Sequence, residues 1–480
     1  MGRYSRRSVL RVAGAMLGGV ALGSTVTAAE RTDRFIVRTR DATSASALEA
    51  EGLTVVHELP EVGYFVVEGA ERDVEAAPGE FEPDIELTFE DPVADVLTEA
   101  TGSVDAASPA GASATDEPLY GFQWDKQAQG VPEAHETTRG EGARVAVIDT
   151  GVAAAHPDLA HAVNEDLSAN FTGDGQGVAN AAGGYHGTHV AGIVAANDRN
   201  EAGVVGTAPG AEVVDCRVFA DDGSASFGGI VAAIHYSATA GCDVANLSLG
   251  NYPVPRSAYA RYYARFLHRV TTYATRMGTT VVAATGNDGV DLDTDGAVVA
   301  VPAEAPGVVA VSATGPIGFG YGDPGLEKPV DSPAPYSNHG ESVVDLSAPG
   351  GNVNPERPAG WEQDLVLSSA SLPQFDDAGA YVGAIHTYFW IAGTSMAAPQ
   401  GAGAAALVAA QRSRRRGRFV ERVLRRTAAD APGGREYHGH GHLDTLAAVQ
   451  RAARSAGGRG NGSGRDEVDD EHGRGRGRGR

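Results

Sequence analysis

Cysteine, lysine and aromatic residues are all scarce in this chain of 480 residues. Two cysteines, Cys216 and Cys242, are too few for a scaffold that depends on several disulfides. They fall near different strand-like segments, so we expect buried thiols that do not pair. Aromatic residues make up only 6% of the sequence, but hydrophobic residues, at 42%, still suffice for a core.

Positive charge is also scarce, and nearly all of it is arginine. The chain has 38 basic against 62 acidic residues, a net charge of −24, and its only lysines are Lys126 and Lys328. This acidity argues against nucleic acid or an anionic membrane as the main partner. The negative charges on such a surface repel one another at low salt, and high salt screens this repulsion. Because low lysine with high acid resembles proteins of salt-loving microbes, we expect salt-dependent stability; a merely acidic protein is the alternative.

Long apolar runs are missing, apart from a weak one near the N-terminus. Residues 1–29 begin with four arginines and no acidic residue, continue with a glycine-rich apolar stretch and end in small residues. This order is typical of an export signal, and the pair Arg6-Arg7 resembles the twin-arginine type. No stretch approaches the roughly 18 apolar residues of a stable span. We therefore expect a secreted, extracellular protein rather than a membrane-anchored one.

Two further units follow, separated by a segment without periodicity. Residues 30–115 comprise a small α+β unit, with strand-like runs such as 54–59, and a linker rich in Ala, Ser, Gly, Asp and Pro. From 116 to 455 the sequence predicts one large domain. Residues 456–480 are rich in Gly, Arg and acids and cannot bury a core.

The large domain alternates buried strands with alanine-rich helices. Continuous apolar runs at 145–148, 281–284 and 308–311 are typical of strands that are covered on both faces. Helix-like stretches at 189–196 and 397–411 lie between or after them. The pattern predicts an α/β fold, with a doubly wound, mainly parallel sheet between helices. In such sheets functional groups gather at the carboxyl ends of the strands.

Three short segments of this domain hold the parts of an activated hydroxyl group. Asp149 ends a buried strand in the segment Val-Ile-Asp-Thr-Gly, His186 opens His-Gly-Thr-His, and Ser395 lies in Gly-Thr-Ser-Met-Ala. Each alone could be a cap or a loop residue. Together they supply a serine nucleophile, an imidazole that takes its proton and a carboxylate that orients the imidazole.

These segments, in the order Asp, His, Ser, closely resemble those of the subtilases, and among them the secreted haloarchaeal halolysins. The resemblance covers roughly residues 115–450. It implies a subtilisin-like fold and a serine endopeptidase that needs no catalytic cofactor. Asp149 would orient His186, His186 would act as general base and then acid, and Ser395 would attack the peptide bond. The second histidine, His189, would be structural.

The resemblance also implies an oxyanion donor and substrate-binding segments. Asn287, after the strand 281–284, would donate its side-chain amide to the oxyanion; the alternative is an ordinary turn. The substrate peptide would pair with one segment and face another. These two segments comprise Ser248, Leu249 and Gly250, and Ala284, Thr285 and Gly286. Neither carries a charge, which favours uncharged side chains before the cut.

A structural calcium ion is implied by the polar loop 197–204. In the family such a loop binds through backbone carbonyls, one Asn side chain and a distant carboxylate. The matching positions are Asp158, Asp198, Asn200, Ala202 and Val204, with Asp116 as a candidate N-terminal ligand. Oxygen ligands of flexible geometry suit Ca²⁺. A solvated loop is the alternative.

Two other clusters have simpler interpretations. His438, His440 and His442 form an apparent metal box, but flexible Gly spacing gives no preset geometry. The arginines of 412–426 alternate with apolar residues at near-helical spacing, which indicates a surface helix rather than a nucleic-acid site.

The N-terminal unit resembles the inhibitory propeptide of the subtilases. We expect it to assist folding, occupy the cleft and be removed by the enzyme itself, which would then act on polypeptides as a monomer. A catalytically silent relative used for binding is the main alternative, although no triad member is missing. A serine esterase of another α/β fold would need Gly-x-Ser-x-Gly and the order Ser-Asp-His, and neither is present.

Overall fold

The computed structural model describes residues 26–39, 44–89, 98–99, 116–255, 262–294, 298–318, 326–412 and 417–457. The arginine pair of the predicted export signal and the C-terminal segment from residue 458 lie outside the described residues.

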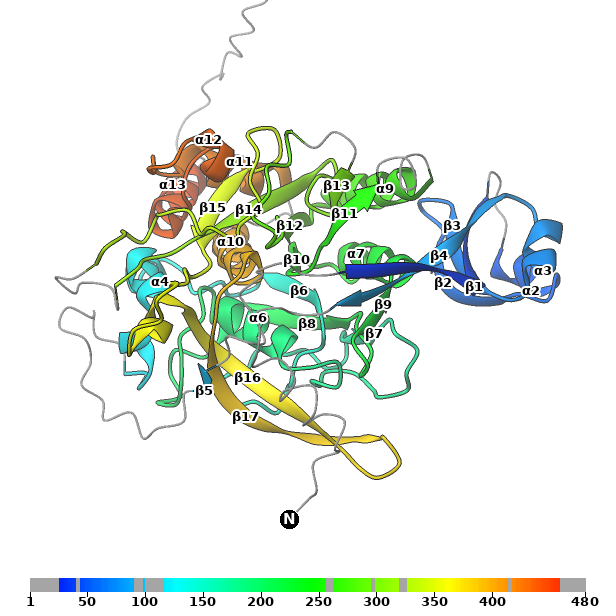
Figure 1. Ribbon diagram of the computed structural model, residues 1–480, viewed down its shortest axis with the longest axis horizontal. Coiled ribbons are helices and arrows are strands. Elements are labelled where there is room, and N and C mark those ends of the chain that lie inside the picture. Colours follow the sequence, from blue (N-terminus) through cyan, green and yellow to red (C-terminus); the bar gives the residue numbers. More distant parts are fainter. Residues whose placement is uncertain are drawn as a thin grey trace, which may run out of the picture.

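A seven-stranded parallel sheet forms the centre of the large domain (Figure 1). Its order is β15-β14-β12-β10-β6-β8-β7. The strands are β6 (Arg144–Asp149), β7 (Ala169–Asn170), β8 (Glu212–Arg217), β10 (Val244–Leu247), β12 (Thr280–Ala284), β14 (Val308–Thr314) and β15 (Leu346–Pro349). The apolar runs at 145–148, 281–284 and 308–311 all lie in this sheet, so the predicted α/β class is confirmed.

Helices cover both faces of the sheet because successive side chains of each strand point to opposite faces. Val145 and Val147 of β6 belong to one hydrophobic cluster, and Ala146 and Ile148 to the other. The first face carries α6 (His186–Ala195), α10 (Thr394–Ala410), α11 (Gly417–Thr427) and α13 (Thr445–Gly457). The second face carries α7 (Phe227–Thr239) and α9 (Tyr262–Met277). Short helices α4 (Trp124–Ala128), α5 (Val131–His135) and α12 (Arg435–His438) complete the domain.

The N-terminal unit is a small α+β fold, as predicted, with two short helices and an antiparallel sheet. It comprises β1 (Val26–Arg38), α2 (Ala45–Glu49), β2 (Thr54–Leu59), β3 (Tyr64–Glu68), α3 (Glu71–Ala76) and β4 (Glu80–Phe89). Its antiparallel order β2-β3-β1-β4 continues into β9 (Ser224–Ser226) of the large domain. The unit lies against α7 and α9, at the right of Figure 1, and Tyr262 and Tyr263 donate hydrogen bonds to its carbonyls.

A long hairpin extends along the bottom of Figure 1, where it is yellow. It consists of β16 (Val366–Phe375) and β17 (Tyr381–Ile391), and β5 (Thr98–Glu99) pairs with β17. A separate antiparallel pair joins β11 (Asn251–Pro255) and β13 (Val298–Val301). The hairpin is not evident in the sequence, because its strands lack regular apolar alternation.

Cys216 and Cys242 are both buried and are not joined by a disulfide, as expected. Cys216 lies on β8 and Cys242 just before β10, and β6 lies between these strands in the sheet. Burial raises the pKa of the Cys216 thiol well above its ordinary value.

Candidate active site

The predicted catalytic and substrate-binding segments leave three neighbouring strands at the same edge of the sheet. Asp149 ends β6, Ser248 follows β10, and Ala284 ends β12. The three strands are adjacent and parallel, and Leu247 pairs with Ile148 and Ala283. Their carboxyl ends therefore lie side by side, which is where the architecture places functional groups.

Asp149 and His186 are in direct contact at this edge. His186 Nδ1 lies 2.8 Å from Asp149 Oδ1, which also accepts a hydrogen bond from the Thr150 N–H at 2.7 Å. The Asp149 side chain is 1% exposed and that of His186 18% exposed. A buried carboxylate that accepts from Nδ1 leaves Nε2 of the imidazole available as a base, as an activated serine requires.

Ser395 lies in the first turn of α10, and a proline shapes its surroundings. Pro399 has no N–H to donate to the carbonyl of Ser395, four residues earlier. Ser248 Oγ donates to that carbonyl instead, at 2.7 Å, and Ser395 Oγ donates to the Ser248 carbonyl at 3.1 Å. The segments 248–250 and 393–399 are thus bound to each other at the end of β10.

The helix that carries Ser395 packs against the helix that carries His186. Both α6 and α10 begin three residues before the predicted starts of their alanine-rich stretches, so each N-terminal turn includes its candidate catalytic residue. His189, one turn into α6, is fully buried and its Nε2 lies 3.0 Å from the Phe389 carbonyl. Burial lowers its pKa to about 3, which is typical of a structural histidine.

Asn287 faces the beginning of α10. Its Oδ1 accepts hydrogen bonds from the Thr394 N–H at 2.9 Å and the Thr394 Oγ1 at 2.8 Å. These two bonds fix which side of the amide points away from the helix. A Cβ built on Gly393 would lie 3.5 Å from Asn287 Nδ2 and 3.6 Å from the Ser395 nitrogen. The side-chain amide and the backbone nitrogen therefore border the same space.

A buried asparagine that sequence reasoning missed supports this loop. Asn338 Nδ2 donates to the Thr285 carbonyl at 3.1 Å, and Asn338 Oδ1 accepts from the Asp288 N–H at 2.9 Å. Gly286 has a φ of +103°, and a Cβ there would lie 2.4 Å from Asn338 Nδ2. Glycine is thus required before Asn287 both by the backbone conformation and by the close approach of Asn338.

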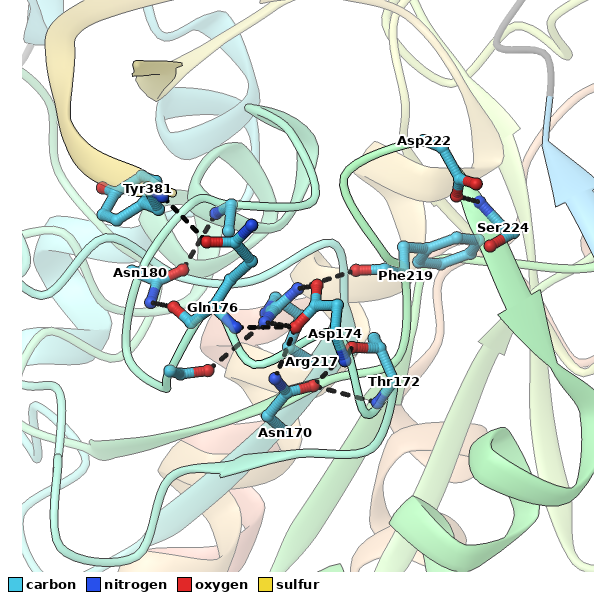
Figure 2. Close-up of polar contacts among 12 residues, drawn as sticks. Asn170, Thr172, Asp174, Gln176, Asn180, Arg217, Phe219, Asp222, Ser224 and Tyr381 are labelled. Carbon is cyan, nitrogen blue, oxygen red and sulfur yellow. Dashed lines mark hydrogen bonds and ion pairs between the residues drawn. The ribbon is translucent and has the colours of Figure 1, made fainter. Parts of the chain in front are cut away.

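Strand β8, next to β6 in the sheet, carries two buried charged residues, and Figure 2 shows the contacts of one of them, Arg217. Arg217, which pairs with Asp149 in the sheet, is fully buried and donates to both oxygens of Asp174, at 2.5 and 2.7 Å. Asp215, also fully buried, accepts from the Ala179 N–H at 3.0 Å. Burial raises the pKa of Asp215 to about 8, and the negative charge of Asp149 adds to the shift.

The predicted calcium-binding positions are brought together only in part. Asp158, fully buried, accepts from Asn200 Nδ2 at 3.0 Å and from Ser369 Oγ at 3.0 Å. Asp198 points elsewhere, because it forms an ion pair with Arg139.

The acidic neighbour of this loop is Glu117 rather than Asp116, which is exposed. Glu117 accepts from the backbone N–H groups of Asn200, at 3.0 Å, and Ala202, at 2.9 Å. Burial raises the pKa of both Glu117 and Asp158, and their proximity adds to the shift in Glu117. The buried Asn200 Oδ1 has no hydrogen-bond partner. An unpaired amide oxygen beside two buried carboxylates is the kind of oxygen donor set that suits a hard cation.

Two histidines of the apparent metal box, His438 and His442, contact the buried hydroxyl group of Ser347. Ser347 Oγ lies 2.6 Å from His438 Nδ1 and 3.0 Å from His442 Nδ1. Within the described part of the chain, no group of three or more His, Cys, Asp or Glu side chains is arranged to hold a metal ion.

Comparisons with known proteins agree with this geometry. Residues 140–458 match the model of the subtilase family. The chain belongs to the subtilase family. It is 31% identical over 328 residues to thermitase of Thermoactinomyces vulgaris, covering 68% of this chain and 96% of thermitase. It is 27% identical over 466 residues to the halolysin-like extracellular serine protease Nep of Natrialba magadii, covering 92% of this chain and 73% of Nep.

Solved structures show the same fold. Fervidolysin of Fervidobacterium pennivorans has a TM-score of 0.63 at 23% identity, covering 88% of this chain and 61% of fervidolysin. A protease of Pseudoalteromonas arctica has a TM-score of 0.57 at 28% identity, covering 71% of this chain and 100% of that protease. This subtilase is a subtilisin-like serine endopeptidase. Among its described helices, none is long and apolar enough to cross a membrane.

Proposed function

We propose that this endopeptidase cleaves peptide bonds through Asp149, His186 and Ser395, by way of an acyl-enzyme. His186 takes the proton of Ser395 as the hydroxyl attacks the carbonyl carbon. It then gives the proton to the leaving amine, and a water molecule repeats the sequence to release the acid. Asp149 keeps the proton of the neutral imidazole on Nδ1 and stabilises the imidazolium. The contact of 2.8 Å between His186 Nδ1 and Asp149 Oδ1 carries this proposal.

Covalent labelling tests the assignment. A fluorophosphonate should label the mature enzyme at Ser395, and His186→Ala should slow labelling by orders of magnitude. A folded enzyme that hydrolyses casein but is labelled at another serine would refute the triad. A folded chain that is neither labelled nor active would instead support a silent relative that acts by binding.

The oxyanion of the tetrahedral intermediate is assigned to Asn287 Nδ2 and the backbone N–H of Ser395. Both nitrogens lie close to the position that a Cβ on Gly393 would take. Thr394 donates to Asn287 Oδ1, which leaves Nδ2 free to point away from Thr394. Donors fixed in advance stabilise the developing charge without having to reorganise during the reaction. The N-terminal end of α10 adds its positive dipole.

The substrate is expected to extend between the ends of β10 and β12. Ser248, Leu249 and Gly250 would pair with its backbone, while Ala284, Thr285 and Gly286 would face the side chain before the cut. Ala284 and Thr285 are uncharged and buried. This supports a preference for uncharged side chains at that position.

The N-terminal unit is proposed to be an intramolecular inhibitor that the enzyme removes. Its strand β4 pairs with β9, with Leu87 opposite Ala225 and Thr88 opposite Ser224. Asp84 of the same strand is buried at the N-terminus of α7 and accepts from the Gly228 N–H at 2.9 Å and from Ser226 Oγ at 2.6 Å. We propose that processing removes residues 30 to about 115, which comprise this unit and the linker after it.

Calcium is proposed to stabilise the loop 197–204. Asp158 and Asn200 would bind through side-chain oxygens, and Asp198, Ala202 and Val204 through carbonyls. The buried carboxylate of Asp158 and the unpartnered Asn200 Oδ1 support this assignment. The ion would supply positive charge that offsets Asp158 and Glu117, and would take no part in catalysis.

We also propose that the protein is exported through the twin-arginine route and that it is active in concentrated salt. The arginine pair at residues 6–7 and the net charge of −24 support these proposals. Replacing both arginines by lysine should retain the precursor in the cell. A salt series from dilute buffer to molar NaCl should raise the melting temperature.

A further inference from the structure

A buried ion pair lies on the short helix α4. Asp125 and Lys126 are both fully buried, and Lys126 Nζ lies 3.3 Å from Asp125 Oδ2. Taking two charges out of water is costly, so apolar residues of similar size often give equal or greater stability in the place of such a pair. Among the described residues, Asp125 Oδ1 has no hydrogen-bond partner, which adds to this cost. Stability alone therefore does not explain the pair, and the other contacts of Lys126 indicate a different role.

The ammonium group of Lys126 joins the two helices that carry the proposed base and nucleophile. Its Nζ donates to the Ile193 carbonyl of α6 at 3.0 Å and to Gln400 Oε1 of α10 at 2.7 Å. Ile193 lies about two helical turns after His186, and Gln400 lies in the second turn of the helix that begins beside Ser395. The Ile193 carbonyl is at the C-terminal end of α6, where a positive charge also complements the helix dipole. One side chain thus binds both helices.

The amide of Gln400 is held at both ends, which ties α10 to both members of the ion pair. Its Oε1 accepts from Lys126 Nζ and also from Thr207 Oγ1, the latter at 3.1 Å. Its Nε2 donates to Asp125 Oδ2 at 2.6 Å. Thr207 Oγ1 in turn accepts from Lys126 Nζ at 2.9 Å. The donors and acceptors of this cluster therefore match in one arrangement of α4 and α10.

Helix α4 is itself fixed by the residues just before the ion pair. Trp124 Nε1 donates to the Leu365 carbonyl at 2.8 Å, next to the start of β16. Gln123 Nε2 donates to the Val205 carbonyl at 2.9 Å, and Gln123 Oε1 accepts from the Val205 N–H at 2.7 Å. Lys126 therefore extends from a part of the chain that is bound on two sides.

The side chains of α10 are too small to fix its position against its neighbours by interlocking. Alanine and glycine make up most of α10, which packs against α6. Small residues let elements approach closely, but they form shallow ridges that resist sliding less than large side chains do. Because His186 and Ser395 lie in the first turns of these two helices, such sliding would change the distance between imidazole and hydroxyl. A misplacement of about 1 Å can slow a reaction about 100-fold.

We propose that Lys126 is a positioning residue, which fixes α6 against α10 and so sets the approach of the His186 imidazole to the Ser395 hydroxyl. The proposal rests on the proposed triad. A buried polar network that is bonded to several elements favours the one arrangement that satisfies its hydrogen bonds. This gain in uniqueness, rather than in stability, accounts for a charge pair in the interior.

The test compares two buried glutamines in the mature enzyme. Gln400→Leu removes the bond between Lys126 and α10 and leaves the ion pair in place. Gln129→Leu is the matched control, since Gln129 is also buried, at the C-terminal end of α4. Its amide binds the Leu443 carbonyl at 2.7 Å and Thr445 Oγ1 at 2.8 Å, and neither partner lies on α6 or α10.

We expect Gln400→Leu to lower kcat for a peptide anilide between about tenfold and 100-fold, with KM within about twofold of the wild type. The reason is that the change affects the alignment of the reacting groups and not the binding of the peptide. Labelling of Ser395 by a fluorophosphonate should slow by a similar factor, because it needs the same proton transfer to His186. Gln129→Leu should lower the melting temperature by a similar amount, but its kcat and labelling rate should stay within about twofold of the wild type.

A second variant separates positioning from stability. Asp125→Leu/Lys126→Met/Gln400→Leu replaces the charges and the amide together by apolar side chains of similar size. Its melting temperature should be at or above that of Gln400→Leu, because no buried charge is left without its partner. Its kcat should nevertheless be as low as that of Gln400→Leu, because the link through Lys126 between α6 and α10 is gone.

A kcat of Gln400→Leu equal to that of the wild type, or an equal loss of kcat in Gln129→Leu, would overturn the proposal. So would a rise in KM at constant kcat, or a triple variant with the kcat of the wild type. Failure of the proposed triad is distinguishable, because the wild type itself would then be labelled at a serine other than Ser395, or not at all.

Discussion

His186 Nδ1 lies 2.8 Å from Asp149 Oδ1, although 37 residues separate the two in the chain. Asp149 ends a central strand and His186 begins the helix packed on that strand, so the contact is a product of the α/β architecture. It fixes the tautomer of the imidazole and thereby its capacity to act as a base.

Asp149→Asn should lower kcat by about 10⁴-fold with little change in KM. An amide of the same shape still meets Nδ1, but it favours the wrong tautomer and does not stabilise the imidazolium. Steady-state kinetics on a peptide anilide measures the effect. Circular dichroism should show an unchanged fold, and a loss of less than tenfold would exclude Asp149 from the mechanism.

Asn287→Leu should lower kcat by roughly 10²–10³-fold and leave KM nearly unchanged, since the lost donor acts on the oxyanion and not on the bound substrate. Thr394→Val removes the hydroxyl that binds Asn287 Oδ1 and should have a smaller effect of the same kind. A rise in KM at constant kcat would instead mean that Asn287 only binds substrate.

Removal of calcium should lower the melting temperature. When the free calcium concentration is 100 times the Kd of the site, binding stabilises the folded state by about 2.7 kcal/mol. Differential scanning calorimetry with and without EGTA measures this shift at constant salt. Asp158→Asn should abolish the shift, whereas Asp221→Asn, at an exposed position, should preserve it. An identical melting temperature in chelator and in calcium would remove the ion from the account.

Asp215 should make stability depend on pH. Its pKa is raised from 3.8 to about 8 in the folded chain, mainly by burial, so the folded state binds more protons than the unfolded state between these values. The stabilisation is complete below about pH 4 and is lost as the pH rises toward 8, by at most about 1.4 kcal/mol per pH unit.

Asp215→Asn keeps the acceptor for the Ala179 N–H but cannot ionise. Its free energy of unfolding should therefore rise relative to the wild type between pH 5 and pH 8, as urea titrations in molar salt would measure. Asp377→Asn, at an exposed position, is the matched control. A constant difference between Asp215→Asn and wild type over this range would show that Asp215 is ionised throughout.

The sequence predicts those features that depend on local pattern. Unbroken apolar runs predict β6, β12 and β14, which the structure confirms. Short motifs predict that Asp149 meets His186, and the two side chains are in contact.

Features that depend on contacts between distant segments could not be predicted. Lys126 reads as a surface lysine, yet it is fully buried and its Nζ donates to Gln400 Oε1 at 2.7 Å, Thr207 Oγ1 at 2.9 Å and the Ile193 carbonyl at 3.0 Å. Asn338 likewise sits in an unremarkable polar stretch but supports the Asn287 loop. In both cases the hydrogen-bond partners come from several elements, so the spacing of residues along the chain does not predict these contacts.

The central claim is that Ser395 is the nucleophile and that the enzyme processes its own precursor. The most direct measurement is the N-terminal sequence of the secreted wild type and of Ser395→Ala, produced side by side. The account predicts a wild type that begins near residue 116 and a Ser395→Ala protein that retains the N-terminal unit. A Ser395→Ala protein processed at the same bond, at the same rate and in the absence of other proteases, would contradict it.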